Sequence, residues 1–144
     1  MTQEEIFNLL IRPFGNAPVQ IPPESFKDLD VEFINYTPEE SIEIAAPLYP
    51  KYNNPAGTTL GGYLPVFFDL AFGPLSFLVA KKPTTTLELN TSYHRPISVK
   101  DGKIFVKASV VHKGRSYLFL EAQAFNPDRK LVATATSRLR ILDM

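Results

Sequence analysis

The sequence contains no cysteine and only two histidines, His94 and His112. The absence of cysteine excludes disulfide bonds, thiolate metal ligands and a cysteine nucleophile. Two histidines are too few for a histidine cluster, so we expect no metal site, although they say nothing against a site built from carboxylates. Carboxylates therefore remain candidates for chemistry.

The chain also lacks an excess of charge of either sign. Lysine and arginine together number 15, as do aspartate and glutamate, so the formal net charge is zero. This balance gives no electrostatic reason to expect nucleic-acid binding. The first five residues are acidic rather than basic, and no adequate apolar stretch follows them, which argues against a secretory signal. We expect a soluble, cytoplasmic protein with one domain over residues 1–144.

The long apolar run at residues 61–80 contains one charged residue, Asp69. An ionised carboxylate on such a segment is costly to desolvate unless it is hydrogen-bonded or paired. Ordinary core packing gives no reason for this residue, so we interpret Asp69 as a functional group. The alternative is a structural carboxylate that buried backbone groups or a neighbouring threonine satisfy.

This apolar run is long enough to cross a bilayer, for which about 20 mainly apolar residues suffice. However, two glycines open it, two prolines interrupt it, and Lys81 and Lys82 close it. We therefore reject a membrane span. The run instead predicts the central helix of a soluble protein, surrounded by other elements.

The two prolines set the expected limits of this helix. Proline is tolerated only within the first turn, so Pro65 places the start at residues 61–64. Pro74 is expected to kink or end the helix, with a distortion at residues 70–73.

Gly61 and Gly62 lie at the expected helix start, where unobstructed backbone N–H groups form a ready anion or oxyanion site. Close helix packing is the structural alternative for these glycines. Asp69 follows Gly61 by about 12 Å along the helix axis, at about 1.5 Å per residue. The two groups therefore cannot easily serve one small reacting group within the same subunit.

The rest of the chain predicts a short helix, capped by Thr2, and a sheet. Prolines and glycines forbid regular structure at residues 12–23, so residues 1–30 form the short helix and an extended connection. The expected elements are a helix at 3–10, a hairpin at 31–36 and 41–46, and strands at 84–94, 103–112, 117–125 and 131–142, each of the last four joined by a hairpin-like turn. One antiparallel sheet wrapped around one long helix, an α+β fold, accounts for this pattern.

This order of elements resembles the hotdog fold. More narrowly, the spacing of Asn54, Gly57, Gly61, Gly62 and Asp69 is similar to that of the acyl-CoA thioesterases of the phenylacetate-pathway and thioesterase-superfamily-member-2 type. The likeness covers roughly residues 31–142, and residues 93–96 resemble the turn that follows the third strand of the family.

The resemblance implies hydrolysis of an acyl-CoA thioester. Asp69 would act as the nucleophile or as the general base for water. The Gly61 N–H would hold the developing oxyanion, assisted by the Asn54 side chain, whose structural alternative is an Asx-type turn. Thr86, with Thr85 beside it, falls where the family often has a hydroxyl that positions water. Such sites are usually shared across a dimer, with the helix start from one subunit and the aspartate from the other.

CoA is part of the implied substrate, so no separate cofactor is expected. Its phosphates need cationic partners, which loop residues could supply, although such charges are more often simply solvated. The expected substrate-binding residues are Gly57, Leu60, Gly62, Thr85, Arg95, Lys113 and Arg115. Aromatic residues of the helix could line an acyl pocket, or form the core: Tyr63, Phe67, Phe68, Phe72 and Phe77.

One position departs from the family pattern, because Leu60 stands where the family usually has a histidine that is thought to orient the substrate carbonyl or site waters. This departure motivates a second hypothesis, a non-catalytic hotdog module that binds acyl-CoA or a lipid-like ligand. A third is a dehydratase or hydratase, which ranks low because neither histidine lies near the glycine-rich helix start. Exposed sheet edges in hotdog proteins are usually relieved by pairing, so we expect a homodimer or homotetramer.

Overall fold

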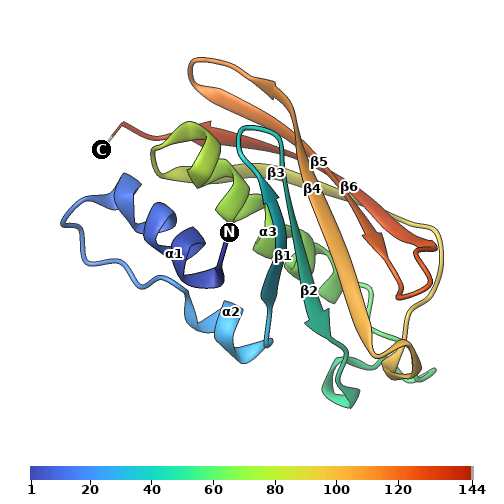
Figure 1. Ribbon diagram of the computed structural model, residues 1–144. Helices are drawn as coiled ribbons and strands as arrows, with labels where there is room; N and C mark the ends of the chain where they lie inside the picture. The colour runs from blue at the N-terminus through green and yellow to red at the C-terminus, as the bar shows by residue number, and fades with distance from the viewer. Residues whose placement is uncertain (144) are drawn as a thin grey trace.

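A six-stranded antiparallel sheet curves around one long helix in the computed structural model, which describes residues 1–143 (Figure 1). The strand order is β1-β2-β4-β5-β6-β3. The helices are α1 (Gln3–Ile11), α2 (Glu24–Asp28) and α3 (Tyr63–Ala80), and the strands are β1 (Glu32–Thr37), β2 (Ser41–Pro47), β3 (Thr84–Tyr93), β4 (Lys103–Lys113), β5 (Tyr117–Phe125) and β6 (Leu131–Ile141). Helices α1 and α3 lie on the same side of the sheet (Figure 1).

The central helix begins where Pro65 predicts, because α3 starts at Tyr63 with Gly62 as its N-cap. The sequence predicts a kink or an end at Pro74. The helix does not end there, since α3 continues through that residue to Ala80, and the kink stays a prediction. A proline inside a helix costs about 3 kcal/mol or more. Burial offsets this cost, because Leu75 and Val79 beyond it are almost fully buried, and each such side chain contributes about 1.5–3 kcal/mol.

The core lies between α3 and the concave face of the sheet. Phe67, Phe68 and Phe72 are fully buried there, so they are core residues rather than the wall of an open pocket. By length and composition α3 could cross a membrane, but the sheet wraps it, as expected of a core helix. The alternation predicted for β4 is confirmed, since Ile104 and Val106 are buried against this helix.

The connection after β3 differs from the sequence-based expectation. Residues 98–102 were expected to form a hairpin-like turn, but β3 pairs with β6 and is not a neighbour of β4. The connection instead contains a single 3-10 turn, Val99–Asp101, with a capping box between Ser98 and Asp101. Local turn residues reveal that the chain turns but not which strand it will pair with. The two hairpins β4–β5 and β5–β6 are confirmed.

The N-terminal segment is more ordered than expected. The capping box between Thr2 and Glu5 at the start of α1 is present. However, a 3-10 turn covers Arg12–Phe14, and α2 follows the proline-rich stretch. Both begin next to a proline, which helices accept in the first turn. Helix α2 forms because Phe26 is buried in the common core, a tertiary contact with no local signal.

Candidate active site

Asp69 lies on α3 at the rim of a cavity of about 140 Å³ between this helix and the N-terminal segment. Its other lining residues are mostly apolar and include Phe7 from α1, Phe26 from α2, and Gly73 and Phe77 from α3. The Asp69 side chain retains solvent access in the single chain. A reactant could therefore reach the carboxylate while its apolar part enters the cavity.

Desolvation by the surrounding apolar atoms raises the pKa of Asp69, and a hydrogen bond from Thr86 opposes this effect. The Thr86 hydroxyl donates to Asp69 Oδ1 over 3.5 Å, which is long for a hydrogen bond. A carboxylate with a raised pKa is a better proton acceptor than a free one. The structure thus brings together two residues to which the family resemblance gives catalytic roles, and those roles stay predictions.

Thr85 lies differently from Thr86. The hydroxyls of Thr84 and Thr86 both contact α3, at Ser76 and Asp69 respectively. Successive side chains of a strand point to opposite faces, so Thr85 faces away from the helix. Within one chain it is therefore not positioned to act with Asp69.

The Asn54 side chain organises the loop before α3. Its Oδ1 accepts hydrogen bonds from the backbone N–H groups of Ala56 and Thr58, and its Nδ2 donates to the Thr58 hydroxyl. Gly57 occupies the turn with a φ of 85°, a conformation that side chains disfavour. The turn alternative weighed for Asn54 is thus observed, and its assistance to an oxyanion stays a prediction.

The helix start presents unpaired donors. In residues 1–143 the N–H groups of Gly61 and Gly62 have no hydrogen-bond acceptor. Leu60 is 47% exposed beside them. The Tyr93 hydroxyl donates to the Gly61 carbonyl over 2.8 Å, which holds this backbone in place. The sequence indicates the turn after Tyr93, but no local pattern in it signals this contact.

Gly61 also borders a second cavity, of about 260 Å³, which lies beside the turn after β3. Arg95 lines the same cavity, so the structure brings this predicted cation to the predicted oxyanion site. Thr59 lines it too, and its buried hydroxyl has no hydrogen-bond partner among residues 1–143. The cavity therefore offers backbone donors, a hydroxyl and one cation to an anionic ligand.

Lys113 and Arg115 lie elsewhere, at the turn between β4 and β5. Lys113 donates a hydrogen bond over 2.9 Å to the carbonyl of Val79, in the last turn of α3. This end is about 27 Å from the helix start, for 18 residues at about 1.5 Å each. Within one chain, Lys113 stabilises the C-terminal end of α3 and is not part of the Gly61 site.

A single chain does not unite Asp69 with Gly61. The cavity beside Asp69 and the cavity beside Gly61 share no lining residue. Asp69 and the Gly61 N–H thus lie apart along α3, as the sequence predicts, and each borders a different cavity. That one site uses both Asp69 and Gly61, from two subunits, stays a prediction.

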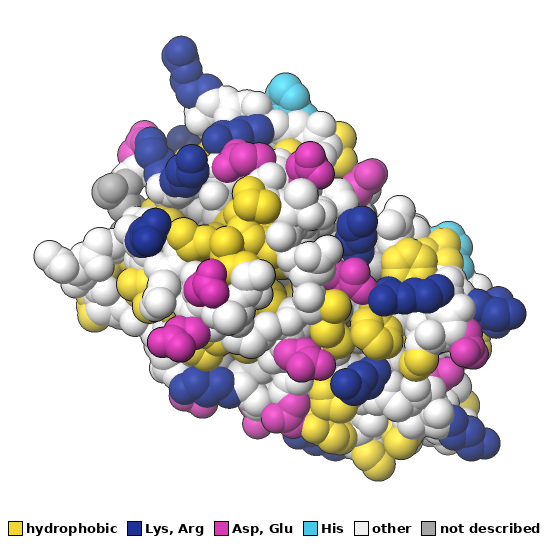
Figure 2. Space-filling model, viewed as in Figure 1, with side chains coloured by type: hydrophobic (Ala, Val, Ile, Leu, Met, Phe, Trp, Pro, Cys, Tyr) yellow, Lys and Arg dark blue, Asp and Glu magenta, His cyan; other side chains and the backbone are white. Residues whose placement is uncertain are grey.

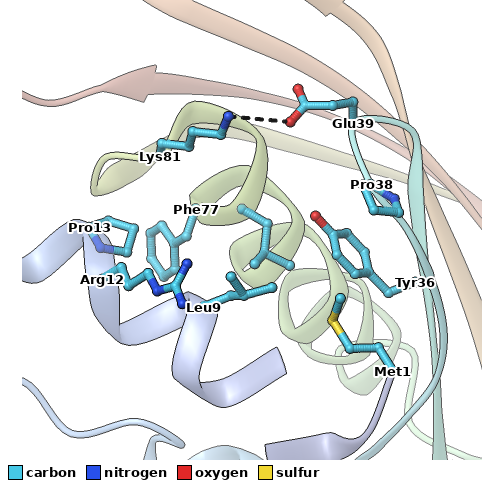
Figure 3. Close-up of a pocket in the computed structure, with 10 residues that line it drawn as sticks. Met1, Leu9, Arg12, Pro13, Tyr36, Pro38, Glu39, Phe77 and Lys81 are labelled. Carbon is cyan, nitrogen blue, oxygen red and sulfur yellow. Dashed lines mark ion pairs between the residues drawn. The ribbon is translucent and has the colours of Figure 1, made fainter. Parts of the chain in front are cut away.

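A larger cavity, of about 400 Å³, is lined by Phe77 but by none of the predicted catalytic residues (Figure 3). It lies between α1, the C-terminal end of α3 and the β1–β2 hairpin, where Lys81 and Glu39 form an ion pair of 4.0 Å. Phe77 lines both this cavity and the one beside Asp69.

The surface shows no patch of one charge on the face viewed in Figure 2, where basic and acidic side chains are interspersed. Over residues 1–143, no three histidine, aspartate or glutamate residues gather where they could hold a metal ion. The candidate site thus consists of one carboxylate, backbone donors, hydroxyls and one arginine.

Comparison with known proteins gives a family match. The model of the thioesterase superfamily matches residues 56–133, whereas no functionally curated protein matches the sequence. Among solved structures, the chain is similar to the PaaI protein of the E. coli phenylacetic acid degradation operon, with a TM-score of 0.81, 15% identity, and coverage of 99% of this chain and 97% of that one.

Two further structures are similar. A thioesterase of Haemophilus influenzae gives a TM-score of 0.79 at 18% identity, covering 99% of this chain and 92% of that one. A conserved protein of Pseudomonas aeruginosa gives 0.77 at 25% identity, covering 88% and 99%. These likenesses agree with the predicted hotdog fold. Because the family match spans more than half of the 144 residues, the chain belongs to the thioesterase superfamily.

Proposed function

We propose that this protein hydrolyses an acyl-CoA thioester, with Asp69 as the central catalytic group. The observation that carries the proposal is a carboxylate with a raised pKa at the mouth of an apolar cavity, on the core helix of a thioesterase-superfamily chain. An apolar acyl group can enter the cavity while its thioester carbonyl remains beside the carboxylate.

Two forms of the reaction use the same groups. As a general base, Asp69 takes a proton from water, the hydroxide attacks the carbonyl carbon, the C–S bond breaks, and protonated Asp69 passes this proton to the leaving CoA thiolate. As a nucleophile, Asp69 attacks the carbonyl itself and expels the thiolate, and water then hydrolyses the resulting anhydride. In both, the products are free acid and CoA thiol.

The oxyanion would be held by the Gly61 N–H from a second copy of the chain. Strand β3 is an edge strand, and its exposed side chains include Leu87 and Tyr93, which favours edge pairing. Thr86, beside Asp69, lies near one end of β3, whereas Tyr93, beside Gly61, ends the other. Two-fold antiparallel pairing of β3 with its copy would set each Asp69 near the partner subunit's Gly61. The proposal is thus a homodimer, or a tetramer built from such dimers.

CoA would lie along the Gly61 cavity, with Arg95 on its phosphates. Leu60 and Gly62 would border the thioester at the helix start, and Gly57 would shape the loop. Lys113 and Arg115 are supported less well, because they lie at the opposite end of α3. We propose a cytoplasmic enzyme without a resident cofactor.

The test is turnover of a panel of acyl-CoAs, followed by release of free CoA thiol, in the wild type, Asp69→Asn and Asp128→Asn. Asp128 is an exposed aspartate in the β5–β6 turn and serves as the matched control. We expect Asp69→Asn to lose turnover by about 10³-fold or more, as for removal of an essential base or nucleophile, and Asp128→Asn to match the wild type. Equal turnover by all three proteins would refute a catalytic Asp69.

A non-catalytic acyl-CoA binding module is the second candidate, favoured by the exposed Leu60 where the family usually has histidine. It predicts no turnover of any acyl-CoA but measurable binding by calorimetry. Asp69→Asn would then leave the affinity nearly unchanged.

A further inference from the structure

We propose that the cavity beside Asp69 holds the acyl group of the substrate and selects a compact apolar acyl group, about the size of a six-membered ring, with Gly73 as its open floor and Phe77 as its end wall. This inference rests on the proposed function, because it assigns the acyl part of the same substrate.

The positions along α3 define a path. Asp69, Gly73 and Phe77 recur at intervals of four residues, so they share one helix face, and all three line the cavity. Phe77 lies about 12 Å beyond Asp69 along the axis, at about 1.5 Å per residue. A group that starts at the carboxylate thus passes Gly73 before it meets the phenyl ring.

The space is open at Gly73. A Cβ atom built there would meet no atom within 4 Å, although the residue lies inside a helix, where glycine is unfavourable relative to alanine. Backbone conformation does not require this glycine, since its φ is not in the left-handed region. The missing side chain therefore enlarges the cavity at no benefit to the helix.

The volume fits a compact group. The cavity measures about 140 Å³ and its lining is almost wholly apolar apart from Asp69. An apolar cavity of about 150 Å³ stays dry and binds benzene. Phe77, which packs edge-on against Phe14 with ring centroids 5.3 Å apart, closes this space from the larger cavity of about 400 Å³.

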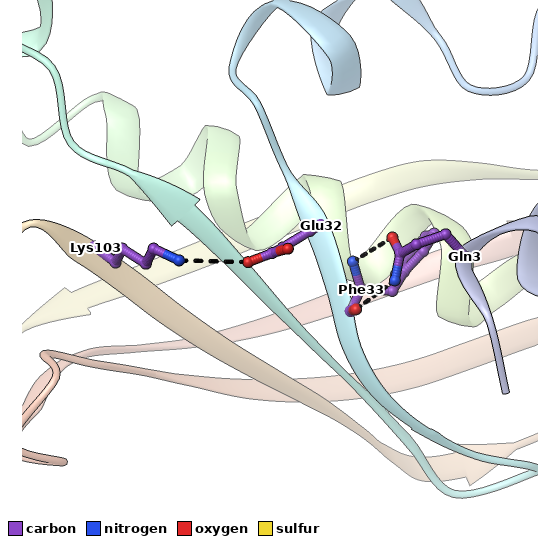
Figure 4. Close-up of polar contacts among 4 residues, drawn as sticks. All are labelled: Gln3, Glu32, Phe33 and Lys103. Atoms are coloured by element: carbon purple, nitrogen blue, oxygen red, sulfur yellow. Dashed lines mark hydrogen bonds and ion pairs between the residues drawn. The ribbon is translucent and has the colours of Figure 1, made fainter.

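The opposite wall comes from the N-terminal segment, which lies outside the matched residues 56–133. Phe7, Phe26 and Phe33 pack together with ring centroids 5.0–5.6 Å apart. The Gln3 side chain joins α1 to the outer edge of β1, because it accepts from the Phe33 N–H over 2.8 Å and donates to the Phe33 carbonyl (Figure 4). These contacts therefore fix the wall in place.

The experiment compares kcat/KM for acetyl-, hexanoyl-, benzoyl- and dodecanoyl-CoA in the wild type and in two opposed variants. Gly73→Leu fills the cavity, and we expect the hexanoyl-to-acetyl ratio to fall about tenfold or more. Phe77→Ala joins the two cavities, and we expect the dodecanoyl-to-hexanoyl ratio to rise about tenfold or more. Phe119→Ala, which removes an exposed ring from β5, is the control and should change neither ratio. If Phe77→Ala does not fold, Phe77→Leu replaces it.

The inference is overturned if the wild type has a higher kcat/KM for dodecanoyl-CoA than for both hexanoyl- and benzoyl-CoA. It is also overturned if Gly73→Leu leaves the hexanoyl-to-acetyl ratio of kcat/KM unchanged. If the wild type hydrolyses none of the four, the proposed function fails, and calorimetry with a non-hydrolysable hexanoyl-CoA thioether then decides the inference. A loss of affinity of about tenfold or more in Gly73→Leu would support the acyl cavity, whereas equal affinity would reject it.

Discussion

Two regions of the molecule meet at Asp69, and they differ in whether the model of the thioesterase superfamily matches them. Residues 56–133 match the thioesterase superfamily and contain the carboxylate and the helix start. Residues 1–55 lie outside the match, yet α1, α2 and β1 supply most of the wall that faces the carboxylate. In the proposed enzyme the shared region provides the chemistry, and the N-terminal region shapes the space for the substrate.

The largest expected effect tests whether Asp69 of one subunit acts together with Gly61 of a second subunit. Gly61→Val places a branched side chain at the helix start and should lose about 10²-fold or more in turnover. Asp69→Asn removes the carboxylate and should lose about 10³-fold or more. In a shared site, a mixed dimer keeps one intact pair of groups. Coexpression of the two variants should then restore about one quarter of wild-type activity, the share of intact sites under random pairing.

Two measurements control this experiment. Mixing each variant with wild type shows whether dimers exchange, and sedimentation gives the oligomeric state. Coexpression that restores nothing, although mixed dimers are present, would place both groups in one subunit and contradict the shared site.

The second prediction loosens the N-terminal region alone. Gln3→Glu keeps the size of the side chain but cannot donate to the Phe33 carbonyl and sets a negative charge beside it. We expect a loss of about 1–2 kcal/mol in the free energy of unfolding, measured by urea denaturation. Glu4→Gln, an exposed neighbour on α1, is the control. Unchanged stability in Gln3→Glu would show that α1 is not held to β1 by this contact.

A smaller effect is expected in the shared region at Tyr93. Tyr93→Phe removes the hydroxyl that donates to the Gly61 carbonyl over 2.8 Å. Loss of one such hydrogen bond costs about 0.5–1.5 kcal/mol, so kcat/KM should fall about three- to tenfold. Tyr117→Phe, which changes an exposed tyrosine at the start of β5, should leave kcat/KM unaltered. If kcat/KM falls more in Tyr117→Phe than in Tyr93→Phe, the hydrogen bond from Tyr93 to Gly61 does not support catalysis.

The features that were predictable from sequence are those set by neighbouring residues. Thr2 and Glu5 form their cap, Pro65 fixes the start of α3, and the alternation in β4 marks its buried face. The place of β3 at the edge was not predictable, because strand pairing depends on distant residues. Burial beyond Pro74 likewise outweighs a strong local signal to end the helix.

The candidate site likewise contains features set by neighbouring residues and features set by distant ones. The isolation of Asp69 in an apolar run makes it a candidate catalytic carboxylate, and the family resemblance adds Thr86, which the structure places beside it; their catalytic roles stay predictions. The contact of Tyr93 with Gly61 and the cavity wall at Phe7 arise only when segments far apart in sequence pack together. No local pattern in residues 1–30 distinguishes a wall of a binding site from a surface connection.

The last prediction uses pH to compare the carboxylate with the apolar wall around it. Burial raises the pKa of folded Asp69 above its ordinary value of 3.8, so the folded state favours the protonated form. The associated stability is present below that value and is lost as pH rises through the raised pKa. Asp69→Asn resembles the protonated acid at every pH. Its Tm should therefore exceed that of the wild type at pH 7, and the difference should vanish below pH 3.8. Thermal denaturation at fixed protein concentration measures this, because dimerisation would otherwise shift Tm. A difference that is independent of pH would mean that the cavity does not destabilise the charge, and that the carboxylate is solvated like any surface aspartate.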